Sequence, residues 1–164
     1  QPFIFSQIRG NAQLSLPIKA QVSDYLHRLL TVYPLQGLGS LDFIVQHQQA
    51  YLLEINPRIP ASAQLYQSDL LTQHILACET GSLPAVNPGT PFSAYKIIYS
   101  PHQLTISASI DWPDWVCDRP APGAIIGKNQ AICSIIAAVK QSDQLQALIS
   151  ERQSFVENLL HIGS

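Results

Sequence analysis

The stretch that decides the fold is residues 41–58, LDFIVQHQQAYLLEINPR. Two apolar segments, residues 41–46 and 51–55, flank a short polar stretch, which predicts two β-strands joined by a tight turn through residues 47–49. Each strand carries one carboxylate, although the chain has only 11 acidic residues. Burying a carboxylate costs several kcal/mol unless a cation compensates it. The two acids in these buried-looking strands therefore need an explanation.

The spacing of the two acids suggests what they do. Asp42 and Glu54 are equidistant from Gln48, so a turn centred there places their carboxylates opposite each other. Opposed like charges repel, unless a divalent cation lies between them. Asn56 projects from the same face as Glu54, because side chains alternate along a strand. Arg58 follows, a cation suited to phosphate or carboxylate. This set is typical of a magnesium–phosphate site.

Spacing alone leaves a second interpretation open. Asp42 could be an ordinary residue at a strand edge, and Glu54 could form a surface ion pair with Arg58. Short acidic motifs are common, so the pattern by itself does not choose between a metal site and a structural role.

The rest of the chain predicts an α+β fold in two parts. Apolar periodicity and capping residues predict helices at residues 17–32, 69–79 and 143–160. Short strands are predicted at residues 3–8, 94–99, 104–108, 124–126 and 131–139. The Pro- and Gly-containing residues 82–91 mark the expected boundary, with residues 1–91 as one domain and 92–164 as a small β subdomain with a closing helix.

Composition excludes several classes of protein. The net charge is −2 without clustered Lys or Arg, which argues against nucleic-acid binding. There is no 18-residue apolar run and no signal peptide, so we expect a cytoplasmic protein without a membrane partner. Three widely spaced cysteines and five unpaired histidines predict buried thiols and no zinc. Position 1 is not Met, which suggests a piece of a longer parent chain.

The ordered segments GSLDF (39–43), YLLEINPR (51–58) and IPAS (59–62) resemble the C-terminal half of an ATP-grasp domain, as found in biotin carboxylase and carbamoyl phosphate synthetase. This resemblance implies that Asp42, Glu54 and Asn56 bind the Mg²⁺ (or Mn²⁺) ions of ATP, so Glu54 and Asn56 also hold the nucleotide cofactor. It implies that Arg58 is catalytic and contacts the phosphate or acyl intermediate. It places Ser62 near the substrate.

Residues 118–135 and the closing helix resemble the small β subdomain of the ATP-grasp ligases of tetrahydromethanopterin and one-carbon metabolism, including tyramine-glutamate ligase relatives. The resemblance implies an enzyme, an ATP-dependent carboxylate–amine ligase that works through an acyl phosphate on small-molecule carboxylate and amine substrates.

The lysine-bearing strands of the family are absent from this sequence. The expected partner is therefore the missing N-terminal half of the same parent chain, and we expect this chain alone to be inactive. A homodimer is one candidate for the assembly. Two alternatives stay open: a biotin-carboxylase-like carboxylase, and a non-catalytic binding or assembly module derived from the fold.

Overall fold

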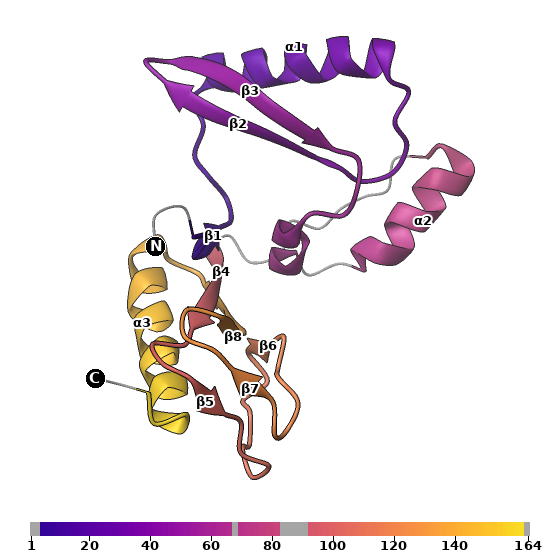
Figure 1. The fold of residues 1–164 in the computed structure, drawn as a ribbon. Coiled ribbons are helices and arrows are strands. Elements are labelled where there is room, and N and C mark those ends of the chain that lie inside the picture. The colour runs from indigo at the N-terminus through magenta and orange to yellow at the C-terminus, as the bar shows by residue number, and fades with distance from the viewer. Residues whose placement is uncertain (1–3, 67–68, 83–91, 163–164) are drawn as a thin grey trace. The chain divides into compact units, whose positions relative to one another are not determined.

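The computed structural model describes residues 4–66, 69–82 and 92–162 (Figure 1). It has the predicted α+β fold, with antiparallel strand pairs and a C-terminal helix. The chain forms two compact units, residues 12–89 and residues 1–11 with 90–164. The predicted boundary at residues 82–91 lies, apart from Ser82, outside the described residues.

The first strand belongs to the second unit. Strand β1 (Gln7–Arg9) pairs antiparallel with β4 (Phe92–Tyr99), with Ile8 opposite Tyr95. The prediction grouped this segment with residues 1–91, because the boundary was placed at the turn-rich residues 82–91. Strand pairing is a long-range contact, so sequence order did not reveal the partner.

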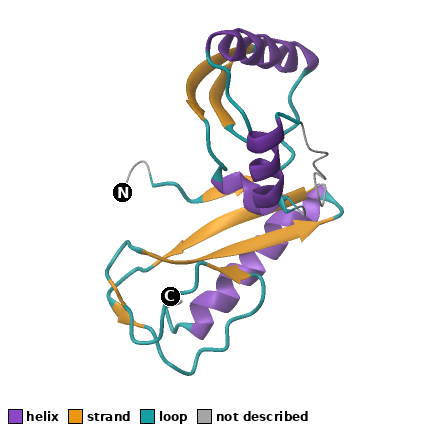
Figure 2. Cartoon of the chain, turned by 90° about the vertical axis from the view of Figure 1, so that its right-hand side faces the viewer, coloured by secondary structure: helices purple, strands orange, loops and turns teal. Residues whose placement is uncertain are grey.

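Residues 12–89 build the unit that carries the acidic hairpin. Its elements are α1 (Leu16–Val32), β2 (Ser40–Gln46), β3 (Gln49–Asn56), the 3₁₀ turn η1 (Ala61–Leu65) and α2 (Leu70–Thr80). Helix α1 lies alongside the β2–β3 hairpin in both views (Figures 1 and 2). Pro17 sits in the first turn of α1, where its missing N–H is not needed.

Helix α1 covers one side of the hairpin at Ala50, which is only 1% exposed. The Gln21 side-chain oxygen accepts a hydrogen bond from Ala50 N at 2.9 Å, and the Tyr25 hydroxyl donates to Ala50 O at 2.9 Å. Both backbone groups of Ala50 are thus satisfied without a third strand. The helix therefore fixes which face of the hairpin is covered.

Helix α2 has the ends that the sequence predicts. Asp69 is the N-cap, and the Thr72 hydroxyl and backbone N–H donate hydrogen bonds to its carboxylate, which lowers the pKa of Asp69. Gly81 ends the helix in the left-handed conformation, with φ 69°. The 3₁₀ turn η1 before this helix was not predicted, because five residues are too few for a periodic signal.

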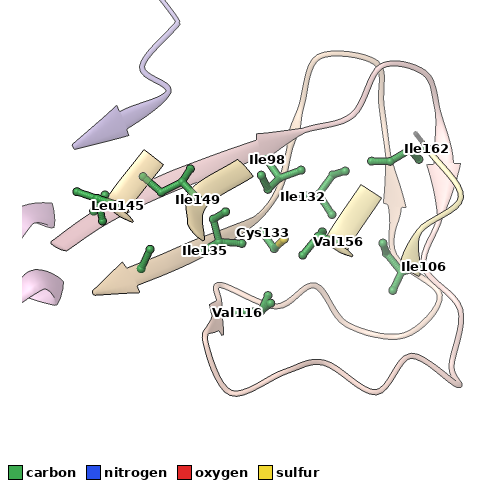
Figure 3. Packing of buried hydrophobic residues seen from close by; sticks show 12 residues of the cluster. Ile98, Ile106, Val116, Ile132, Cys133, Ile135, Leu145, Ile149, Val156 and Ile162 are labelled. Carbon is green, nitrogen blue, oxygen red and sulfur yellow. The ribbon is translucent and has the colours of Figure 1, made fainter. Parts of the chain in front are cut away.

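The other unit is a four-stranded sheet in the order β1-β4-β8-β6, with β8 at Ala131–Val139 and β6 at Val116–Cys117. Helix α3 (Ser142–Leu159) packs on one face of β4 and β8. A separate pair, β5 (Leu104–Thr105) and β7 (Ile125–Ile126), completes it. Figure 3 shows side chains of α3 packing against those of the strands; the buried set includes Ile98, Ile106, Val116, Ile132, Ile135, Leu145, Ile149 and Val156. The two-residue strand β6 was not predicted.

A polar network joins β4, β8 and the chain after β6. The Tyr95 hydroxyl donates to Asp118 Oδ2 at 2.9 Å, and the Ser134 hydroxyl lies 2.6 Å from the same oxygen. Asp118 has φ 53°, in the left-handed region. Arg119 then donates to the carbonyl of Val116 at 2.8 Å. These bonds hold the chain after β6 against the sheet.

The three cysteines differ in exposure. Cys133 is buried on β8, and burial raises the pKa of its thiol to about 12. Cys117 is half-buried, and burial raises the pKa of its thiol as well. Cys78 is exposed, so the expectation of three buried thiols is wrong for this one. Cys78 follows the buried Ala77 on α2, and one residue along a helix rotates the side chain by about 100°.

No helix in the described residues is long and apolar enough to cross a membrane.

Candidate metal and nucleotide site

The β2–β3 hairpin closes through two residues in the left-handed conformation. His47 has φ 49° and Gln48 has φ 62°, and Gln46 pairs directly with Gln49. Positive φ at both central residues matches the right-handed twist of the strands, as in two-residue hairpin turns. The prediction of a turn centred on Gln48 is therefore wrong, because the centre lies between His47 and Gln48.

This tighter turn would, in a regular hairpin, place Asp42 opposite Leu53 and Glu54 opposite Leu41. The observed register is different, because Phe43 pairs with Leu52 while Asp42 pairs with Glu54. Leu53 is the extra residue of a β-bulge, which shifts the register by one. The predicted pairing of Asp42 with Glu54 is thus confirmed, but a shorter turn and a bulge produce it together.

The two faces of the hairpin are different. Leu41 and Ile55 are register partners and both line an apolar cavity of about 360 Å³, together with Leu26 of α1 and Ala77 of α2. Alternation along the strands then turns the flanking pair, Asp42 and Glu54, to the opposite, outward face. Without the bulge, Glu54 would oppose Leu41 and point toward the cavity.

Both carboxylates on the outward face are exposed. The sequence suggested that these acids are buried, and the structure corrects this: the hairpin is covered on one face only, so neither acid is removed from water. Apolar side chains surround them on the same strands, with Ile44 55%, Tyr51 51% and Leu53 62% exposed. The outward face therefore combines two anions with exposed apolar area.

Asn56 and Arg58 stand at the end of the same strand. The Asn56 amide nitrogen donates to Asp42 Oδ2 at 3.4 Å, so this side chain reaches across the hairpin to the acid pair. Arg58 N donates to Asn56 O at 2.8 Å, which turns the chain directly after the strand. The Arg58 side chain is exposed, and within the described residues it forms no ion pair with Asp42 or Glu54. The alternative of a Glu54–Arg58 surface pair is therefore not the arrangement found.

The donor set at this strand end fits a hard divalent cation. Asp42 and Glu54 offer carboxylate oxygens. If the side-chain amide of Asn56 flips, its oxygen takes the place of the nitrogen that now contacts Asp42, and Asn56 offers a third oxygen. Among residues the structure describes, no group of three or more His, Cys, Asp or Glu side chains could hold a metal. A cation at this strand end would therefore have only the two carboxylates and the Asn56 amide oxygen as protein ligands, with water or phosphate oxygens completing its coordination.

Ser62 lies in η1 and lines a second cavity of about 340 Å³, with Ser40 and Tyr66 among the other lining residues. Ser40 is the register partner of Asn56, so this cavity adjoins the strand end that carries the acids. Sequence reasoning missed Ser40. One signal was available, because Ser40 and Asn56 are equidistant from Gln48, as Asp42 and Glu54 are.

Solved structures share this fold. A single-chain, multi-domain long-chain acyl-CoA carboxylase matches 96% of this chain with a TM-score of 0.70 at 15% identity. Phosphoribosylamine–glycine ligase from Thermotoga maritima matches 89% with a TM-score of 0.62 at 11% identity. An ADP complex of N5-carboxyaminoimidazole ribonucleotide synthetase matches 99% with a TM-score of 0.58 at 14% identity. No family model matches the sequence, and no curated protein matches it.

These likenesses define the class of fold: the chain has the fold of the C-terminal part of ATP-grasp enzymes. It corresponds to 20% of the acyl-CoA carboxylase chain and to 42% of each of the other two chains. Identities of 11–15% show the fold alone, so the activity of this chain has to be argued from its own site.

Proposed function

We propose that this chain is the metal-binding C-terminal part of an ATP-grasp carboxylate–amine ligase. The observation that carries the proposal is the direct pairing of Asp42 with Glu54 on the outward face, with the Asn56 amide in contact with Asp42. Two opposed carboxylates without a cation are unfavourable, and a shared Mg²⁺ removes that repulsion. The N-terminal half of the same parent chain is the proposed partner that completes the nucleotide site.

The outward face also suits the rest of a nucleotide. Ile44 and Tyr51 are register partners, and both are about half exposed. Ile44 lies two residues from Asp42 along β2, on the side of the hairpin turn. A purine base can bury its flat faces on such side chains, while its phosphates lie toward Asp42 and Glu54. One fold neighbour is an ADP complex, which supports nucleotide binding by the parent protein.

In the proposed reaction, a Mg²⁺ ion held at the hairpin would supply positive charge that offsets the charge on the phosphate oxygens of ATP. A substrate carboxylate oxygen attacks the γ-phosphorus, ADP leaves, and an acyl phosphate forms. An amine nitrogen then attacks the acyl carbon, phosphate leaves, and the nitrogen releases one proton to give the amide. Asp42, Glu54 and Asn56 would hold the metal, and Arg58 would supply a fixed positive charge to the transferred phosphoryl group.

The experiment is ATP-dependent ligation by the full-length parent protein, screened against panels of amino acids and amines. Glu54→Gln removes one metal-binding charge at almost unchanged volume, and we expect it to abolish turnover while the protein stays folded by circular dichroism. Glu79→Gln, near the end of α2, is the matched control and should keep wild-type activity. Wild-type turnover in Glu54→Gln would refute the proposal.

A carboxylase is the second candidate, favoured by the acyl-CoA carboxylase among the fold neighbours. Strict dependence of ATP hydrolysis on bicarbonate would establish it against the ligase. A non-catalytic module would neither hydrolyse nor bind ATP in the full-length protein. The narrower assignment to the ligases of tetrahydromethanopterin metabolism stays a prediction, and so do a cytoplasmic location and a homodimer.

A further inference from the structure

The cavity at Ser62, next to the strand end that carries the acid pair, has a lining that indicates what kind of group can bind there. It is lined by four apolar residues, Leu38, Pro60, Ala63 and Leu70, and by Gly39, Ser40, Ser62 and Tyr66. Among the residues that the structure describes, no acidic or basic side chain lines it. Its volume of about 340 Å³ is enough for a small organic group.

The cavity is held directly against the strand end that carries the proposed metal ligands. Gly39 forms part of its wall, and a Cβ on Gly39 would lie only 2.9 Å from the carbonyl oxygen of Asn56. Ser40 continues the wall and pairs with Asn56. Gly39 therefore lines the cavity and also packs against the backbone of Asn56, whose side chain contacts Asp42.

The rest of the wall follows directly from the same strand. After Arg58, Pro60 starts the 3₁₀ turn η1, with Ala63 N donating to Pro60 O at 2.9 Å. Four residues after Arg58, Ser62 reaches the cavity. The cavity wall at Leu38 is held by a hydrogen bond from the Leu38 N–H to His74 Nδ1 at 2.9 Å. The cavity is therefore built by segments anchored to the acidic hairpin and to α2.

We propose that this cavity binds the uncharged, partly apolar tail of the carboxylate substrate, whose carboxylate lies outside the cavity toward Arg58. This inference rests on the proposed function and adds the chemical class of the acid. A charged tail would lose its hydration against apolar walls without a counter-ion, whereas a hydroxyl or an alkyl tail would not. Ser40, Ser62 and Tyr66 offer hydroxyl groups for one neutral polar group on the tail.

The test compares four acids of similar length that differ in tail charge: pentanoate, 4-hydroxybutyrate, 4-aminobutyrate and succinate. Binding to the chain is followed by the amide chemical shifts of residues 61–66 in NMR titrations. We expect pentanoate and 4-hydroxybutyrate to bind at least about tenfold more tightly than the two acids with charged tails. Equal dissociation constants for all four acids would overturn the inference.

Two variants in the same 3₁₀ turn distinguish binding in the cavity from binding on the surface beside it. Ala63→Leu fills the cavity and should weaken binding of pentanoate at least about tenfold. Ala61→Leu makes the same change at an exposed residue outside the cavity and should bind like the wild type. Unchanged binding in Ala63→Leu, with the protein folded by its amide spectrum, would contradict the assignment.

Line broadening by Mn²⁺ of the amides of Glu54 and Asn56 gives an independent readout of the proposed function. Broadening at the hairpin without selectivity among the acids would leave the metal site intact and overturn the cavity assignment. Selectivity for neutral tails with no Mn²⁺ effect would keep the cavity as a binding site and overturn the proposed function.

Discussion

Replacing Glu54 by Gln should stabilise the metal-free chain and remove its response to Mg²⁺. Asp42 and Glu54 face each other on exposed strand positions without an ion pair among the described residues. Directly opposed residues in an antiparallel pair interact by about 0.2–1 kcal/mol, and for like charges this is a repulsion. Glu54→Gln removes it, so the free energy of opening the hairpin should rise by that amount.

Binding of the metal should reverse the order of stability of the wild type and Glu54→Gln. A cation that binds only the folded state adds about 2.7 kcal/mol at a concentration of 100 times its dissociation constant. This gain exceeds the repulsion between the two carboxylates. The wild type should therefore become more stable than Glu54→Gln at saturating Mg²⁺, although it is less stable without metal.

Hydrogen exchange of the β2 and β3 amides measures both effects locally. In the metal-free variant, exchange should slow by about 1.4- to 5-fold, the factor that corresponds to the repulsion. Mg²⁺ should slow exchange by about 100-fold in the wild type only. The fluorescence of Trp112 and Trp115 reports on the other unit and should not change. Faster exchange in metal-free Glu54→Gln, or equal protection of both proteins by Mg²⁺, would refute the reasoning.

Three further predictions concern stability. Gly37→Ala should destabilise the chain by about 1–3 kcal/mol in urea denaturation, because Gly37 has φ +81° and its Cβ would lie 2.6 Å from the His74 ring. Asp118→Ala should cost about 1–3 kcal/mol, because it removes the carboxylate oxygen that accepts hydrogen bonds from both the Tyr95 and the Ser134 hydroxyls. Because burial raises the pKa of Cys133 to about 12, the unfolded chain loses this thiol proton first. Stability should therefore fall by about 1.4 kcal/mol per pH unit from about pH 9 to pH 12, and Cys133→Ala should remove this slope relative to the wild type.

The sequence by itself determined most of the local structure. Helix α1 and helix α2 follow from apolar periodicity with Pro17, Asp69 and Gly81 at their ends. The signals for these elements lie within a few residues of each other, so no distant contact is needed to read them. The candidate site residues Asp42, Glu54, Asn56 and Arg58 could also be predicted from the sequence. They lie in one continuous segment, residues 41–58, in which Pro57 marks the end of the second strand.

Only the tertiary structure decided how that segment presents its acids. His47 and Gln48 do not predict a two-residue turn in the left-handed conformation, because this turn normally carries glycine or asparagine. The bulge at Leu53 depends on which face of the hairpin α1 covers, because burying Leu41 and Ile55 requires the acids to turn outward. The pairing of β1 with β4 and the cavity around Ser62 likewise join residues far apart in the chain. Such contacts are set by packing between elements, and packing is not encoded in any single local pattern.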